Sequence, residues 1–202
     1  MRYILFLALS LFLIGCHQKK VVGIVPYKGM APDKVDTISK VISNFYDVKI
    51  VVLPERKLYK EAYTAVKSPR YRADSIIRIQ KRADLDTLDY VLGLTNSDIS
   101  ITKYDTNGNI RKPESRYRDF GIMGLAYCPG NSSVVSTYRI QHKDTEITLS
   151  RFKKVVIHEF GHNLGLPHCE DKHCVMTDAV EKIATVDNAK MKLCKKCKGK
   201  LN

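Results

Sequence analysis

The chain has 202 residues, of which 44% are apolar and 27% are charged, and its formal net charge is +13. A chain of this length and composition can bury a hydrophobic core, which excludes a largely disordered protein and is typical of one domain. The positive charge favours anionic surfaces, lipid head groups or acidic polymers as partners. Nucleic acid is not expected as a partner, because the basic residues are scattered along the chain.

The first 20 residues predict an exported and lipid-anchored protein. An apolar run over residues 3–14 is too short to span a bilayer comfortably and is typical of a signal peptide. Leu13-Ile14-Gly15-Cys16 resembles the bacterial lipobox, in which the cysteine is acylated and the chain is cut before it. We expect a lipoprotein signal peptide over residues 1–15 and a lipidated tether over residues 16–20. The alternative is an ordinary signal peptide or an uncleaved anchor.

Strands and helices are predicted to alternate along the next part of the chain. Their apolar spacing predicts a strand over residues 21–26, a helix capped by Asp33 and ending at Phe45, a strand over 48–53, a helix over about 70–85 and a strand over 90–94. This alternation predicts a sheet with helices packed on it. Polar residues 104–119 predict a loop or hairpin, and two more strands are expected over 120–127 and 134–138.

A metal-binding motif follows, in a segment from about Thr148 that is predicted to be helical. His158-Glu159-Phe160-Gly161-His162 has the pattern H-E-x-x-H, and residues four apart share one face of a helix. Both imidazoles can therefore reach one zinc ion, at about 2.0–2.1 Å. Glu159 would lie beside them, close enough to act as a general base on water. Packed or surface histidines are the alternative interpretation of so short a pattern.

The motif continues beyond the predicted helix. Gly165 can end the helix in a left-handed conformation, after which the chain turns back to His168. The complete spacing, H-E-x-x-H-x-x-G-x-x-H, is the metzincin signature. Three neutral histidines leave the fourth zinc position open, as a catalytic site requires. His17 and His142 are expected at the surface, and His173 is expected to be a solvated neighbour of the cysteines.

Four cysteines after the third histidine predict a second zinc, with a structural role. Cys169, Cys174, Cys194 and Cys197 have spacings that can close a tetrahedral site without an open position. Nearby lysines would offset the negative charge of four thiolates: Lys190, Lys192, Lys195, Lys196, Lys198 and Lys200. Two disulfides are the alternative, since an exported protein meets an oxidising environment. Cys128 is left over and is expected to be a small buried residue.

The run from His158 through Cys169, Cys174 and Met176 to Cys194-x-x-Cys197 resembles the archaemetzincin family. The resemblance covers residues 21–202 and implies an α/β (α+β) zincin or metzincin-like fold. Such a fold has a mixed twisted sheet, an active-site helix and a small Cys-rich zinc-binding C-terminal part. The resemblance also implies two zinc ions per chain, with Met176 forming the Met-turn beneath the catalytic one. By analogy with metzincins, the run from Phe120 to Tyr127 would be the edge strand that pairs with an extended substrate.

The expected activity is the hydrolysis of peptide bonds in a peptide or protein substrate. Zinc would activate water and polarise the carbonyl, while Glu159 would take the proton and pass it to the leaving amine. We expect a monomer, held to a bacterial membrane through the lipid on Cys16 and facing outside the cytoplasm, at the outer membrane where the cell has one. The alternative is a weak or inactive zinc-bearing envelope lipoprotein that binds peptides or protein partners. A zinc-finger-like nucleic-acid binder would rest on the cysteines and charge alone, and the signal peptide argues against it.

Overall fold

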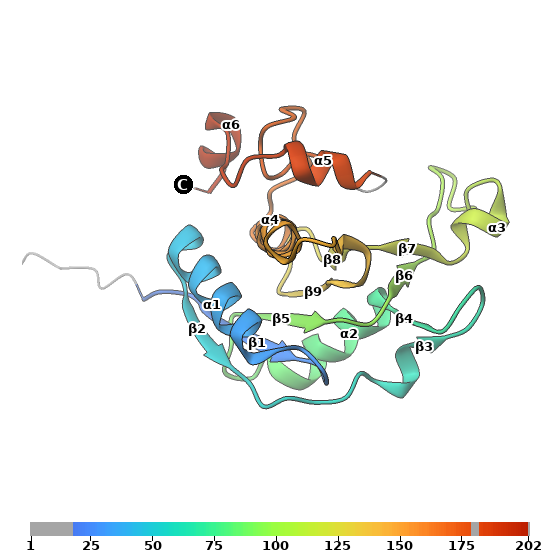
Figure 1. Ribbon diagram of the computed structural model, residues 1–202, viewed down its shortest axis with the longest axis horizontal. Coiled ribbons are helices and arrows are strands. Elements are labelled where there is room, and N and C mark those ends of the chain that lie inside the picture. Colours follow the sequence, from blue (N-terminus) through green and yellow to red (C-terminus); the bar gives the residue numbers. More distant parts are fainter. Residues whose placement is uncertain (1–17, 179–181, 202) are drawn as a thin grey trace, which may run out of the picture.

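The computed structural model describes residues 18–178 and 182–201 (Figure 1). The predicted signal peptide over residues 1–15 and the lipidation site Cys16 lie outside this range. The described chain begins with exposed residues 18–20 and enters the first strand at Val21. Within the described residues, no helix combines the length and the apolar character needed to cross a bilayer.

A five-stranded mixed, twisted sheet forms the centre of the molecule, in the order β2-β1-β5-β9-β8. Four strands run parallel, and β8 pairs antiparallel with β9 at one edge. Their bounds are Val21–Pro26 (β1), Lys49–Val52 (β2), Tyr90–Thr95 (β5), Gly124–Ala126 (β8) and Ser132–Ser136 (β9). The near-continuous apolar runs of β1 and β5 fit parallel strands that are buried on both faces.

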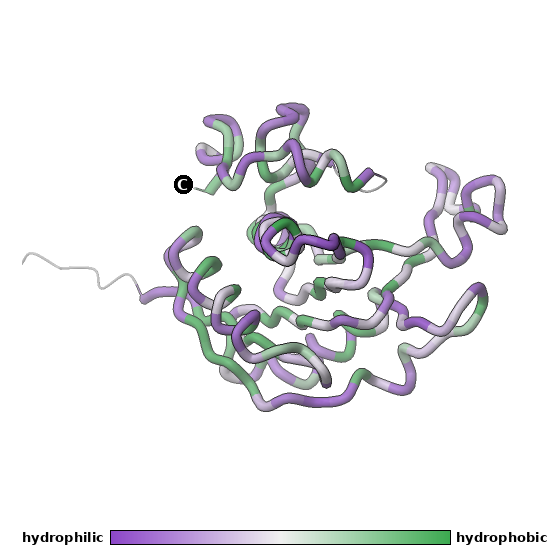
Figure 2. Tube along the Cα trace, viewed as in Figure 1, coloured by the Kyte–Doolittle hydropathy of each residue, from purple (hydrophilic) through white to green (hydrophobic). Residues whose placement is uncertain are grey.

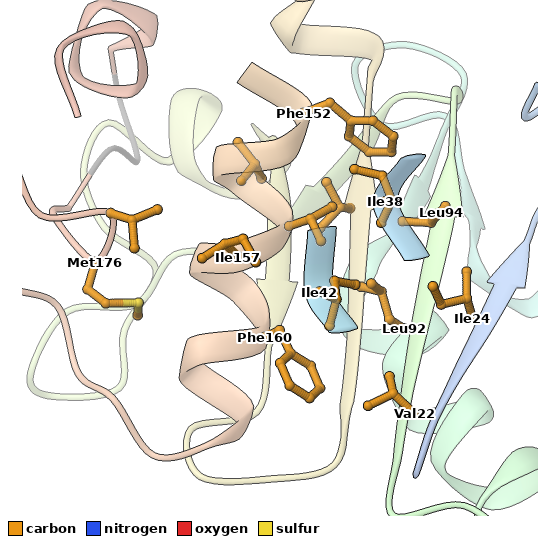
Figure 3. Close-up of a cluster of buried hydrophobic side chains, with 14 of the residues drawn as sticks. Val22, Ile24, Ile38, Ile42, Leu92, Leu94, Phe152, Ile157, Phe160 and Met176 are labelled. Carbon is orange, nitrogen blue, oxygen red and sulfur yellow. The ribbon is translucent and has the colours of Figure 1, made fainter. Parts of the chain in front are cut away.

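Helices cover both faces of this sheet (Figure 1). Helices α1 (Pro32–Tyr46) and α4 (Thr145–Asn163) pack on one face, and α2 (Ala73–Asp84) packs on the other. Figure 3 shows α4 sending Phe152 and Phe160 toward the sheet, where they meet side chains from β1 and β5. Each large apolar side chain buried in this way contributes about 1.5–3 kcal/mol to folding. The helix that carries the metal motif is therefore a core element.

A smaller four-stranded sheet adjoins the central one, in the order β3-β4-β6-β7. Its strands are Tyr63–Thr64 (β3), Arg70–Arg72 (β4), Ile99–Ile101 (β6) and Phe120–Ile122 (β7). The short helices are Lys60–Ala62 (η1), Glu114–Tyr117 (α3), Tyr138–Ile140 (η2), Ile183–Asn188 (α5) and Lys195–Lys198 (α6). Figure 2 shows hydrophobic residues concentrated along the central strands and hydrophilic ones along the outer loops.

Several predicted boundaries are wrong, for identifiable reasons. The helix expected over 70–85 begins at Ala73, because Arg70–Arg72 pair with β3 and β6 as strand β4. Asp33 does not cap α1: Pro32 occupies the first turn and Ala31 holds the N-cap position. The motif helix begins at Thr145, where the Asp144 side chain accepts a hydrogen bond from the Glu146 amide at 2.8 Å.

The run expected to form one edge strand over residues 120–127 is divided. Residues 120–122 form β7 of the smaller sheet, and residues 124–126 form β8 at the edge of the central sheet. Met123 lies between the two strands, so the chain crosses from one sheet to the other at that residue. The part of the predicted edge strand that borders α4 is therefore β8 alone.

Candidate active site

The second half of α4 brings His158 and His162 together, one helical turn apart. Their Nε2 atoms lie 3.0 Å from each other. The Nδ1 of His158 donates to the carbonyl of Val175 at 2.8 Å, and the Nδ1 of His162 donates to the carbonyl of Leu166 at 2.7 Å. Because a carbonyl can only accept, each Nδ1 carries the proton and each Nε2 keeps its lone pair for a metal.

The chain reverses after α4 and returns His168 to the same place. Gly165 has φ +88, the left-handed conformation predicted for it, and its amide donates to the His162 carbonyl at 2.8 Å. The candidate ligand atoms of His158, His162 and His168 lie within 4.8 Å of one another. His168 is exposed, and its Nδ1 faces a carboxylate oxygen of Asp178 at 3.8 Å. We call these three residues the histidine site.

Burial sets the protonation state of the histidine site. Desolvation lowers the pKa of His158 to about 3 and also lowers the pKa of His162. Both imidazoles are then neutral near pH 7, the form that binds a metal. Three converging nitrogen donors, two of them oriented by backbone carbonyls, fit the ligand set of a catalytic zinc ion. The other histidines behave as expected within the described residues, since His142 and His173 are exposed.

A cavity of about 480 Å³, here called the cleft, opens beside the histidine site. Glu159 and the three histidines line it together with β8 and largely apolar side chains. Burial raises the pKa of the Glu159 carboxyl group to about 8. Strand β8 approaches Glu159 closely at Gly124, where a Cβ atom would lie only 2.6 Å from Glu159 Cγ. The absence of a side chain at Gly124 therefore makes room for Glu159.

Cys128 lies at the rim of the cleft and is exposed, so the prediction of a buried core residue was wrong. It follows the edge strand β8, where the chain has already left the core. Its Sγ lies 3.5 Å from the Leu166 carbonyl, to which it donates, while burial on its inner side raises the pKa of the thiol.

Met176 lies against α4 at Gly161, and its side chain is fully buried. A Cβ atom at Gly161 would come within 2.5 Å of Met176 Sδ and 2.8 Å of the Tyr46 hydroxyl. Glycine at position 161 therefore admits Met176 directly beneath the histidine site. The neighbouring carbonyl of Val175 orients His158, so this turn contributes both a packing surface and a hydrogen-bond acceptor.

The sequence could not reveal the two carbonyls that orient the helical histidines. Val175 and Leu166 act through their backbones, and neither side chain carries a signal for that role. Gly124 and Gly161 can be seen in the sequence as glycines, and in the fold each lies next to a motif residue. Only the fold shows which neighbours require them.

The four cysteines predicted to bind a second metal converge beside this turn, and we call them the cysteine site. Their sulfur atoms lie within 4.8 Å of one another, with Cys169 and Cys194 at 3.6 Å and Cys174 and Cys197 at 3.8 Å. Sulfur ligands at about 2.3 Å around a tetrahedral zinc would be about 3.8 Å apart. All four cysteines are free thiols, so within the described residues the disulfide alternative is not seen.

The electrostatics of the cysteine site favour a bound cation. Hydrogen bonding from the Cys197 backbone lowers the pKa of Cys194 to about 7, whereas desolvation raises the pKa of Cys174 and Cys197. Four thiolates therefore need a nearby positive charge, which a zinc ion supplies. The tail lysines are all exposed, at Lys190, Lys192, Lys195, Lys196, Lys198 and Lys200.

Backbone hydrogen bonds connect the cysteine site to the histidine site. Cys169 follows His168 directly, and its amide donates to the Met176 carbonyl at 2.8 Å. The amide of Val175 donates to the carbonyl of Lys192 at 2.9 Å. The loop that holds His158 in place is thus fixed on its other side by the cysteine-bearing tail.

The family profile described as peptidase family M54 matches residues 19–202. The archaemetzincin of Haloarcula marismortui is 30% identical over 185 residues, which cover 87% of this chain and 96% of the relative. The archaemetzincin of Methanopyrus kandleri is 33% identical over 170 residues, which cover 81% of this chain and 83% of the relative.

Solved structures agree with these matches. The crystal structure of the Methanopyrus kandleri archaemetzincin is 30% identical, has a TM-score of 0.72, and covers 94% of this chain and 97% of its own. The archaemetzincin of Archaeoglobus fulgidus, complexed with malonate, is 25% identical with a TM-score of 0.69, covering 89% of this chain and 99% of its own. The chain therefore belongs to peptidase family M54, the archaemetzincins, and is a zinc metallopeptidase.

Proposed function

We propose that this peptidase binds its catalytic zinc through His158, His162 and His168 and uses Glu159 as the general base. The observation that carries the proposal is the position of Glu159, which is buried in the same cavity that the three histidines line. A titratable carboxyl group beside three converging imidazoles is the arrangement that metal-assisted hydrolysis requires. The family membership supports this assignment.

The chain's own groups account for the proton transfers. Zinc bound at the histidine site would supply Lewis acidity, polarising the scissile carbonyl and acidifying water. A carboxylate oxygen of Glu159 accepts the proton from that water and later donates it to the nitrogen of the leaving amine. Burial raises the pKa of Glu159 in the metal-free protein, and a zinc ion at the histidine site would favour the carboxylate form that accepts a proton.

Strand β8 is the element that we propose aligns the peptide. One of its edges pairs with β9, and Gly124, Leu125 and Ala126 line the cleft. An extended substrate that adds to the other edge would gain main-chain hydrogen bonds and would lie beside Glu159. The largely apolar lining of the cleft offers surface for apolar side chains of a substrate.

The test is the substitution Glu159→Gln, which keeps the shape of the side chain but removes its basicity. We expect zinc content and thermal stability to be retained, and cleavage of a peptide mixture to fall about 10²–10⁴-fold. Glu146→Gln is the control, because Glu146 is an exposed carboxylate in the first turn of the same helix. Undiminished cleavage by Glu159→Gln would refute the assignment.

We also propose a second zinc at the cysteine site, giving two ions per chain. The sulfur separations near 3.6–3.8 Å support it, since four ligands at tetrahedral distances leave no open position. A closed site of this kind is structural, and here it would hold the loop that carries Val175 and Met176.

We further propose that the peptidase works outside the cytoplasm, attached to a membrane through a lipid on Cys16. The support is the Leu13-Ile14-Gly15-Cys16 sequence behind a short apolar run. Residues 18–20 are exposed where the described chain begins, so a tether can leave the domain there without disturbing the core. The substrates would then be peptides or proteins near that membrane.

A further inference from the structure

A second cavity of about 420 Å³ adjoins the cleft. The two cavities share Ile122 and Met123, the residues at which the chain passes from β7 toward β8. A peptide that runs along the edge of β8 and past its first residue would therefore reach this second cavity. We call it the basic pocket because five cationic side chains line it, at Lys67, Arg70, Arg116, Arg139 and Lys182.

Two buried carboxylates hold the inner wall of the basic pocket. Arg139 makes a two-pronged contact with Asp98, with Nε and Nη2 donating at 2.6 and 2.8 Å. Arg70 lies 3.3 Å from the same carboxylate and 3.6 Å from Asp119. These contacts hold Arg70 and Arg139, and Asp119 also faces Arg72 at 3.8 Å, so both carboxylates are already engaged by arginines.

The position of Arg139 depends on a glycine in β7. A Cβ atom at Gly121 would occupy the space of the Arg139 guanidinium, which lies directly against this strand. The arginine thus rests on bare backbone, between its buried partner Asp98 and the pocket. A chance cluster of solvated cations would not need a glycine at this contact. We therefore take the placement of Arg139 in this wall to be specific.

The outer wall carries two lysines that have no carboxylate partner among the residues that the structure describes. Lys67 donates to the carbonyl of Arg116 at 2.7 Å, and neither Lys67 nor Lys182 takes part in an ion pair with another described residue. Both lysines are exposed, so their ammonium groups can turn toward an anion that enters the pocket. The pocket therefore has arginines held by carboxylates on one wall and exposed lysines on the other.

We propose that the basic pocket binds an acidic side chain of the peptide substrate, so that this peptidase selects peptides with a carboxylate away from the bond cleaved. The proposal rests on the peptidase function proposed above and adds the substrate class. A peptide carboxylate fits better than a free small anion, because the pocket shares Ile122 and Met123 with the cleft where the backbone of the substrate would lie. Charge complementarity of this kind sets specificity and register.

The test compares matched peptides on the zinc-loaded protein. The probes are fluorescein-labelled decapeptides with a single Glu placed at each position in turn, and the same peptides with Gln there. For one position on one side of the scissile bond, we expect kcat/KM about fivefold higher with Glu, as one partly exposed ion pair allows. The preference should shrink in high salt. Equal rates for Glu and Gln peptides at every position would overturn the proposal.

Paired variants separate the pocket from the overall positive charge. Lys67→Gln with Lys182→Gln should bring the Glu-to-Gln ratio close to one. Lys40→Gln with Lys49→Gln removes the same charge from exposed positions on α1 and β2, and should leave the ratio unchanged. If both double variants lower the ratio equally, general charge attraction explains the preference and the pocket does not.

A binding arm distinguishes failure of the pocket from failure of the peptidase assignment. Fluorescence anisotropy on the Glu159→Gln variant measures the affinity for the same peptides without turnover. Tighter binding of the Glu peptides, sensitive to the Lys67 and Lys182 changes, supports the pocket even if no peptide is cleaved. Cleavage with equal affinity for Glu and Gln peptides would contradict the pocket while leaving the peptidase function intact.

Discussion

Glycines determine how closely two neighbours approach the catalytic segment of α4. Gly124 lets β8 lie against Glu159, and Gly161 lets Met176 lie beneath the two helical histidines. A side chain at either position would have to move a residue that the proposed chemistry uses. The site is thus defined as much by the absence of side chains as by the ligands themselves.

Gly124→Ala should impair catalysis more than folding. The added methyl would lie 2.6 Å from Glu159 Cγ, so the carboxyl group must shift. We expect a loss of about 1–3 kcal/mol in unfolding free energy from overpacking, and a fall of up to about 100-fold in kcat from a displacement near 1 Å. Gly199→Ala is the control, because its Cβ would meet nothing closer than 3.5 Å. Normal turnover by Gly124→Ala would show that the contact is unimportant.

The pKa of Glu159 predicts an unusual pH dependence in the metal-free protein. Burial raises it from 4.5 to about 8, so between these values the unfolded chain ionises first and stability falls as pH rises. The buried His158, with its pKa lowered from 6.5 to about 3, gives the opposite slope below pH 6.5. The Glu159 effect should therefore be clearest from about pH 6.5 to 8.

The measurement is thermal unfolding of the metal-free protein across that range, beside Glu159→Gln. Wild type should lose stability relative to the variant as pH rises, because the histidines and cysteines are common to both and cancel. Saturating zinc should flatten the difference, since a nearby dication favours the carboxylate. Parallel curves for the two metal-free proteins would mean that Glu159 is not desolvated as described.

Among the elements, α4 combines a core role with a proposed catalytic one. Its N-terminal half packs Phe152 against the sheet, and its C-terminal half presents the histidines. The cysteine-bearing tail acts on the same helix indirectly, through the loop whose Val175 carbonyl accepts from His158. Loss of the cysteine site should therefore weaken zinc binding at the histidine site.

Cys197→Ser should reduce bound zinc from two ions per chain toward one and also weaken the remaining ion. Removing a thiolate from a closed four-ligand site opens it, and the loop that orients His158 loses its support. Metal analysis and a chelator titration provide the readouts, with about 10–100-fold weaker zinc retention expected at the histidine site. Cys128→Ser is the matched control for the number of bound ions, because Cys128 lies outside the cysteine site. Two zinc ions retained by Cys197→Ser would contradict the assignment.

The elements with long, regular patterns were predictable from the sequence. Strands β1 and β5 have apolar runs, and α1 has apolar residues at helical spacing. Segments with these patterns are buried wherever helices pack on a sheet. The smaller sheet was not predictable. In the sequence, Arg70–Arg72 looks like the polar start of a helix. It forms a strand because Asp98 and Asp119, which are distant in sequence, neutralise its arginines.

The candidate site was likewise predictable only in part. Spacing predicted which histidines and cysteines converge, because four-residue intervals on a helix and a glycine turn have fixed geometry. The basic pocket could not be predicted, since Lys67, Arg139 and Lys182 come from separate parts of the chain. Cys128 was misjudged because exposure depends on which strand lies at the sheet edge.

At the scale of the whole molecule, the domain combines a net positive charge with a proposed lipid tether. The described chain emerges from β1 through exposed residues 18–20. A tether this short would keep the domain close to the membrane surface. Anionic lipid head groups would attract the positive charge over about 10 Å at 0.1 M salt.

Cys16→Ser should convert the protein from a membrane-bound to a released form. Without the thiol no diacyl group can be attached, and the remaining charge attraction is reversible and sensitive to salt. Detergent phase partitioning of cell extracts measures this, with wild type in the detergent phase and the variant in the aqueous phase. Cys128→Ser keeps Cys16 and should partition like wild type. Wild type found in the aqueous phase would refute the anchor.

The hydrogen bond from Val175 to Lys192 also dictates when the enzyme can become active. In chain order the histidines precede Cys194 and Cys197, so they leave the ribosome or the export channel first. Until Lys192 and the cysteines after it follow, the Val175 loop lacks its support from the tail, and the carbonyl that accepts from His158 is less well placed. We expect chains stopped at Met191, which lack the Lys192 carbonyl, to show no cleavage. The protein would thus have no peptidase activity during its synthesis and transit, and would become active only at its destination.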